Sequence, residues 1–257
     1  MALETQDAPL TLDDVELVLH APVGSVIQGL NVDDTTDRDE MAVCIEPPEW
    51  VIGLKHFEQI VKRSRPQGVR SQPGDLDLTV YGLRKFCSLA LKGNPSILLL
   101  FQIPQADLWE CNDVGLELRN LAWAFASKRA GAAFLGYMQQ QRQRLMGERG
   151  QMNVKRPELV EQFGYDTKYA GHILRLGWQG IEYMTRGAFS VPMPKEQCEF
   201  ILSVRRGQVP EQAMLTRAGE LEAELKDAID STWLPDTPDH AAVNRFLIRA
   251  YPRTWWN

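Results

Sequence analysis

The pattern of apolar residues changes near Pro104, and this change constrains the fold more than any other feature of the chain. Before it, short segments alternate apolar and polar residues, as strands do; after it, apolar residues recur with the helical period. The helical patterns cover residues 114–147, 157–163, 165–186, 196–206, 211–229 and 240–251. We therefore predict an α+β protein, with a small mixed-sheet α/β domain over residues 1–104 and a helical domain over residues 105–257.

The first part of the chain is expected to form a sheet. The predicted strands lie at residues 15–21, 37–45, 57–62 and 76–81, and Pro47-Pro48 ends the second of them. A helix is expected from residue 82 to about 92. The triplet Gly93-Asn94-Pro95 ends this helix, because glycine accepts the left-handed cap conformation and proline cannot continue a helix.

A turn of small residues, Gly24-Ser25, follows the first predicted strand, and the triplet Asp37-Arg38-Asp39 opens the second. Residues two apart on a strand share a face, so both carboxylates would point one way and Arg38 the other. Mg²⁺ is usually held by one or two carboxylates and by phosphate oxygens of a substrate. The N–H groups of a Gly-Ser turn that opens a helix suit the β and γ phosphates of a nucleotide. The two segments therefore predict one site for a metal and a triphosphate.

A further carboxylate is expected at such a site, because a metal ion that also activates an attacking hydroxyl would take another acidic ligand. Asp77 is the first candidate, since strand alternation places it on one face with Thr79 and Tyr81. Asp75, at the mouth of the same strand, is the alternative. The predicted catalytic residues and metal ligands are thus Asp37, Asp39 and Asp77.

These segments resemble the nucleotidyltransferases related to DNA polymerase beta, whose signature is a Gly-Ser turn followed by an Asp-x-Asp strand. The chain is most similar to the RNA-ligase-associated (RlaP-like) group of bacteria and phages. Three stretches carry the resemblance: GSVIQGLNVDDTTDRDEMAVCIEPPEWVIGL at 24–54, DLDLTVYGLRKFCSLALKGNPSILLLF at 75–101 and GYDTKYAGHILRLGWQGIEYM at 164–184. The spacing from Ser25 to Asp37 is somewhat longer than in many members of the superfamily. The resemblance implies a nucleotidyltransferase domain whose nucleotide cleft is closed by the helical part.

A mostly basic stripe lies along the predicted helix at residues 165–186. Its members, at helical spacing, are Lys168, His172, Arg175 and Gln179. A triphosphate or a polynucleotide backbone would suit this stripe, and the resemblance implies the same. The alternative is a solvent-facing surface that pairs with neighbours such as Glu182. The predicted nucleotide-binding residues are Gly24, Ser25, Lys168, His172 and Arg175.

Composition excludes several classes of protein. Hydrophobic residues make up 44% of the chain and charged residues 24%, as in folded globular proteins. A net charge of -6 argues against a protein that coats nucleic acid by charge alone. The scattered cysteines argue against a structural zinc site. We expect a cytoplasmic protein without a membrane partner, because neither a signal peptide nor a long apolar run is present.

The expected reaction is transfer of a nucleoside monophosphate from an NTP, such as ATP, to an acceptor hydroxyl with release of pyrophosphate. It would depend on Mg²⁺ or Mn²⁺. An RNA end is the first candidate acceptor. Two alternatives stay open: nucleotidylation of a protein or small molecule, and a noncatalytic nucleotide-binding partner of an RNA-repair system.

Overall fold

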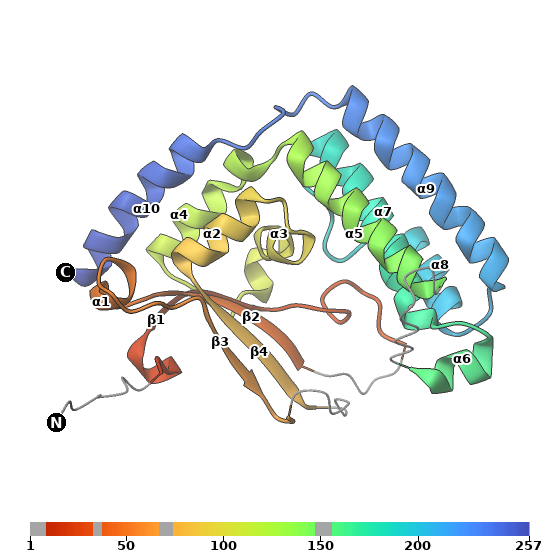
Figure 1. Cartoon of the computed structure of the whole chain (residues 1–257), viewed down its shortest axis with the longest axis horizontal. Helices are drawn as coiled ribbons and strands as arrows, with labels where there is room; N and C mark the ends of the chain where they lie inside the picture. The colour runs from red at the N-terminus through yellow and green to blue at the C-terminus, as the bar shows by residue number, and fades with distance from the viewer. Residues whose placement is uncertain (1–8, 33–37, 67–73, 147–155, 257) are drawn as a thin grey trace.

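The computed structural model describes residues 9–32, 38–66, 74–146 and 156–256. In these residues a five-stranded mixed sheet is combined with helices, so the predicted α+β class is confirmed (Figure 1). The strands, in their order across the sheet, are β3 (Gln59–Arg63), β4 (Leu76–Gly82), β2 (Arg38–Ile45), β1 (Glu16–Pro22) and β5 (Glu110–Cys111). Four of them match the predicted strands to within two residues at either end, and β5 was not predicted.

The central pair of strands sets the position of the acidic residues. β2 and β4 run parallel, with Asp39 opposite Asp77, while the remaining neighbours pair antiparallel. Along β4, Leu78 and Val80 enter a small apolar cluster on one face, and Asp77 and Thr79 alternate with them. The predicted alternation of this strand is therefore confirmed.

Ten α-helices cover the described part of the chain. They are α1 (Pro48–Val51), α2 (Leu83–Leu91), α3 (Pro95–Gln102), α4 (Asp113–Asn120), α5 (Lys128–Leu145), α6 (Pro157–Phe163), α7 (Thr167–Arg186), α8 (Lys195–Arg205), α9 (Glu211–Ser231) and α10 (His240–Trp255). Short 3₁₀ helices occupy Leu12–Asp14, Gln105–Asp107 and Ala122–Phe125. In Figure 1, α10 lies by α2 and α4 over one end of the sheet, and α5, α7, α8 and α9 pack together beyond it. None of the helices in these described ranges has the length and apolar character needed to cross a lipid bilayer.

The prediction of one helical pattern over residues 114–147 is wrong. α4 ends at Asn120, a 3₁₀ turn follows, and α5 begins only at Lys128. The break turns Phe125 into the core, where its ring centroid lies 5.0 Å from that of Phe101. Tertiary packing of this aromatic pair thus overrides the local helical periodicity.

Capping residues fix the ends of the helices that matter most for the site. Gly93 adopts φ +73°, and the side chain of Asn94 accepts from the N–H groups of Ser96 and Ile97, so the predicted stop is confirmed. The Asp166 side chain caps α7 by accepting from Lys168 N and Tyr169 N. α7 ends at Arg186, and Gly187 caps it in the left-handed conformation.

The main hydrophobic core is continuous from β1 to α10 and includes residues on both sides of residue 105. It lies between the sheet and the helices, with Leu19, Phe86, Phe134 and Phe246 among its largest buried side chains. The division into domains 1–104 and 105–257 stays a prediction.

The last helix is attached to the sheet through Glu46, which is 2% exposed. The Tyr251 hydroxyl donates to Glu46 Oε2 at 2.8 Å, and Leu83 N donates to the same oxygen at 3.3 Å. Trp255 Nε1 donates to the backbone oxygen of Glu46 at 2.8 Å. Burial raises the pKa of the Glu46 carboxyl. Trp255 therefore anchors the last helix, whereas Trp256 is exposed.

Candidate functional site

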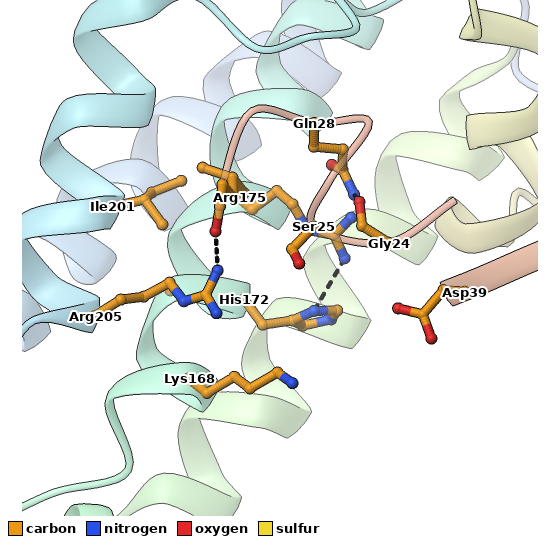
Figure 2. A pocket seen from close by; sticks show the side chains of 11 residues that line it. Gly24, Ser25, Gln28, Asp39, Lys168, His172, Arg175, Ile201 and Arg205 are labelled. Atoms are coloured by element: carbon orange, nitrogen blue, oxygen red, sulfur yellow. Dashed lines mark hydrogen bonds between the residues drawn. The ribbon is translucent and has the colours of Figure 1, made fainter. Parts of the chain in front are cut away.

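Two cavities adjoin one another where the sheet meets α7, and they share Gly24, Asp39 and Arg175. The first, of about 200 Å³, is drawn in Figure 2, and its polar lining includes Ser25, Gln28, Lys168, His172 and Arg205. The second, of about 230 Å³, is lined among others by Met41, Asp77, Thr79, Tyr81, Ser96 and Leu99. One cavity is thus rich in basic side chains, and the other contains the acidic end of the parallel strand pair.

The carboxylates Asp39 and Asp77 lie opposite each other on β2 and β4. Neighbouring strands of a sheet are about 4.8 Å apart, so the two residues are direct neighbours on one face of the sheet. Both line the second cavity. Asp37, the other member of the predicted pair, lies outside the described residues. Its place at the site stays a prediction.

Asp77 is held by a neighbouring strand in this structure. Arg63 Nε lies 3.1 Å from Asp77 Oδ1 and 3.0 Å from Oδ2, and both side chains are partly exposed. The alternative, Asp75, pairs with Arg65 Nε at 2.5 Å and lines neither cavity. An exposed ion pair contributes only about 0–1 kcal/mol, so a ligand can displace Arg63 from Asp77 at small cost.

The donor set around the second cavity fits a hard divalent cation. Carboxylate oxygens are the ligands that Mg²⁺ prefers, and it usually takes one or two of them together with phosphate oxygens. Within the described ranges, no group of three or more His, Cys, Asp or Glu residues is placed to hold a metal ion. Asp39 and Asp77 would therefore form a site that a phosphate ligand, and the carboxylate of Asp37, would complete.

The turn after β1 approaches the carboxylate pair closely. Gly24 adopts φ +83°, and a Cβ atom built on it would lie 2.3 Å from Asp39 Oδ2. Only glycine fits at this position, for both conformational and steric reasons. The expectation that the turn opens a helix is wrong. Ser25 to Gly29 form a compact turn, closed by a bond from Leu30 N to Ser25 O at 2.9 Å, and Gly29 at φ +75° stops helical continuation.

Helix α7 carries the basic side of the first cavity, to which it brings Lys168, His172 and Arg175. Arg175 Nη2 donates to His172 Nδ1 at 2.9 Å. Burial, with the adjacent Arg175 charge, lowers the pKa of His172 to about 3, and burial lowers the pKa of Arg175 to about 10. At neutral pH His172 is therefore an uncharged ring with its proton on Nε2, beside a charged guanidinium.

Several residues at the site were not predicted to act there, among them Arg205, Gln28 and Gln179. Arg205 reaches the first cavity from α8 and donates to Leu30 O in the turn. Gln28 lines the same cavity. Gln179, the fourth member of the basic stripe, is buried and donates a hydrogen bond to Gln28. Periodicity could not reveal these contacts, because they join segments that are distant in the sequence.

Comparison with known proteins adds two similarities. A family model described as "RNA repair pathway DNA polymerase beta family", RlaP, matches residues 4–249. A solved structure of a nucleotidyltransferase-like protein from Exiguobacterium sibiricum is 13% identical, with a TM-score of 0.30, over 91% of this chain and 73% of that one. None of the curated proteins compared matches the chain.

Proposed function

This chain belongs to the RlaP family of polymerase beta-like nucleotidyltransferases associated with RNA repair, and from that premise we propose that it transfers a nucleoside monophosphate from an NTP to an RNA end. The observation that carries the proposal is the meeting of the two cavities at Gly24, Asp39 and Arg175. This arrangement places a glycine turn and a cation on one side of a carboxylate pair. It suits a ligand that carries both phosphates and a metal ion.

The acidic residues would hold the metal ion. Asp39 and Asp77, together with Asp37, would supply carboxylate oxygens to Mg²⁺ or Mn²⁺. When bound, such an ion polarises a phosphoryl oxygen and lowers the pKa of an attacking hydroxyl. Asp77 also lies beside Thr79 and Tyr81 in the second cavity, so we assign the acceptor hydroxyl to this side of the site.

The basic cavity would hold the triphosphate. Lys168, Arg175 and Arg205 line it from α7 and α8, and Gly24 and Ser25 line it from the turn. Cations placed in advance around the phosphates stabilise the negative charge that develops on the leaving pyrophosphate. His172 would donate a hydrogen bond from Nε2 without adding charge, because Arg175 occupies its Nδ1.

One experiment tests the function and its alternatives together. The protein is incubated with each radiolabelled NTP, with Mg²⁺ or Mn²⁺, and with RNA, DNA or lysate protein, and the labelled species is identified. Label on RNA, with pyrophosphate release, supports the proposal. Label on protein or on a small molecule favours the other transferase class, and NTP binding without pyrophosphate release favours a noncatalytic partner.

Substitution of Asp39 tests the role of the carboxylates. Asp39→Asn should leave the fold intact, because asparagine has nearly the same size and shape as aspartate. It should lower the labelling rate by about a hundredfold or more. Mg²⁺ with NTP should raise the melting temperature of the wild type and not of this variant. Asp230→Asn, the same change at an exposed position on α9, is the matched control. Full activity of Asp39→Asn would refute the assignment.

A further inference from the structure

A buried pair of glutamines joins the turn at Gly24 to helix α7. Gln179 Nε2 donates to Gln28 Oε1 at 2.9 Å, and Gln28 Nε2 donates to the backbone oxygen of Gly24 at 2.8 Å. Gln28 is 1% exposed and Gln179 4%, so both amides depend on these partners. Breaking a buried amide pair leaves polar groups unsatisfied, which makes this connection specific as well as stabilising.

The backbone of Gln28 is held as firmly as its side chain. Its carbonyl oxygen accepts from Met193 N at 3.2 Å and from Cys198 Sγ at 3.5 Å. The side chain is bound by α7, and the main chain by the segment that leads into α8 and by α8 itself. Gln28 is therefore a fixed point within the turn, from which Gly24 and Ser25 are oriented.

The bond to Gly24 sets the orientation of one peptide unit. The peptide between Gly24 and Ser25 is planar and trans, so its C=O and its N–H point in opposite directions. Because Gln28 binds the oxygen of Gly24, the N–H of Ser25 is directed away from Gln28. Backbone N–H groups in such turns are the donors that bind phosphate oxygens.

The same helix that holds Gln28 also carries the cations of the first cavity. Gln179 follows Arg175 by one helical turn and His172 by two, so the three side chains lie along one stripe of α7. A shift of the turn relative to α7 would therefore change the distance between the backbone donors and the basic side chains. The glutamine pair fixes this distance in the absence of any ligand.

We propose that Gln28 and Gln179 are positioning residues that align the Ser25 amide with the basic side of α7 and thereby set the affinity for a triphosphate. This inference rests on the proposed function, which identifies the ligand. The site would be preorganised, so that binding an NTP does not have to order the turn. Neither glutamine contacts the reacting atoms in this scheme.

The test uses methionine, which is similar in length to glutamine but has no amide. The variants are Gln179→Met and Gln28→Met in the full chain. The matched control is Gln139→Met, which removes a bond from Gln139 Nε2 to Glu222 Oε1 at 2.8 Å between α5 and α9, away from both cavities. Two measurements are made: amide hydrogen exchange of residues 24–30, and the Kd for a non-hydrolysable NTP analogue with Mg²⁺.

Both site variants should exchange the 24–30 amides about tenfold faster and bind the analogue about tenfold more weakly, and Gln139→Met should do neither. The double variant should be no weaker than Gln28→Met alone, because both changes break one connection. Unchanged exchange in Gln179→Met, or an equal effect of Gln139→Met, would overturn the inference. If Gln28→Met does not fold, Gln179→Met decides the result, since it leaves the bond to Gly24 in place. A wild type that binds no NTP refutes the proposed function, and hydrogen exchange still decides whether the glutamines position the turn.

Discussion

At the level of single residues, Gly24 is where backbone conformation and the carboxylate pair constrain each other. Its φ of +83° disfavours any side chain, and the space for a Cβ atom is filled by Asp39 Oδ2. These two effects can be separated, because Gly164 adopts φ +86° with nothing within 4 Å of the Cβ position. The chain thus contains its own control for backbone strain.

Gly24→Ala should destabilise the protein by more than Gly164→Ala and should displace Asp39. The left-handed conformation costs an alanine about 1–2 kcal/mol at either position, and the clash adds to this only at Gly24. We expect the labelling rate to fall at least about tenfold for Gly24→Ala and to stay near the wild-type value for Gly164→Ala. Urea unfolding and the labelling assay measure the two effects. Equal losses of stability and full activity in both variants would contradict the close approach to Asp39.

His172 should make stability depend on pH. Its folded-state pKa of about 3 lies below the reference value of 6.5, so the folded protein binds fewer protons than the unfolded chain between these values. The contribution is complete above about pH 6.5 and is lost as the pH falls toward 3, since a protonated ring would be a buried charge and would also face the Arg175 cation. The slope approaches about 1.4 kcal/mol per pH unit.

Unfolding free energies from pH 7 to pH 4 check this effect. The curve for His172→Gln should fall less steeply than that of the wild type, because glutamine does not titrate. The exposed His56 gives the control, and His56→Gln should follow the wild-type curve. Parallel curves for the wild type and His172→Gln would show that the imidazole is not held in its neutral form.

At the level of secondary structure, the edge strand β3 controls access to a carboxylate of the site. Arg63 lies opposite Asp77 in the β3–β4 register and binds both of its oxygens. A metal ion bound at the proposed site would therefore compete with Arg63 for Asp77. Arg63→Met should tighten the apparent affinity for Mg²⁺ by about twofold to fivefold, the equivalent of a weak exposed ion pair.

A Mg²⁺ titration of NTP binding measures this competition. Lys62→Met is the control, because it removes the same charge from the preceding residue of β3, whose side chain alternates to the other face. It should leave the apparent Mg²⁺ affinity unchanged. An equal change in both variants would indicate a general effect of charge instead of competition at Asp77.

The elements that could be predicted from sequence are those with a clear period or a clear breaking residue. Such signals predict the strands from β1 to β4, the helix after β4 and the helices from α6 to α10. α3 has no clear apolar period, because all of its residues except Ser96 and Gln102 are apolar and buried. β5 has two residues and exists only through its pairing with Leu19 and His20. Such elements are set by tertiary contacts.

The same distinction applies to the site. Alternation on two strands predicts that Asp39 and Asp77 share a face of the sheet, where both line the second cavity, and the helical repeat predicts that Lys168, His172 and Arg175 share one stripe of α7. The partners of Gln28 could not be predicted, because Gln179 lies 151 positions further along the chain. Only the packing of α7 against the turn brings these amides together.

For the whole molecule, the bond between Tyr251 and Glu46 links the last helix to the sheet. Tyr251→Phe removes the hydroxyl that donates to the buried carboxyl, and we expect a loss of about 1–3 kcal/mol in the free energy of unfolding. Tyr137→Phe is the control, since its exposed hydroxyl only accepts from Asn94 Nδ2 at 3.3 Å and should change stability by less than about 0.5 kcal/mol. Urea denaturation compares the two. Equal small effects would mean that the bond contributes little to holding α10.

The Glu46–Tyr251 contact also has a consequence during synthesis of the protein on the ribosome. Its two residues are separated by 205 positions, and translation proceeds at roughly 5–20 residues per second, so the carboxyl is made roughly 10–40 s before its partner. During that interval the nascent sheet lacks the helix that covers its end. We expect the amino-terminal half to be a client of chaperones until α10 emerges, and ribosome-bound chains ending before residue 240 to be cleaved by protease more readily than released chains.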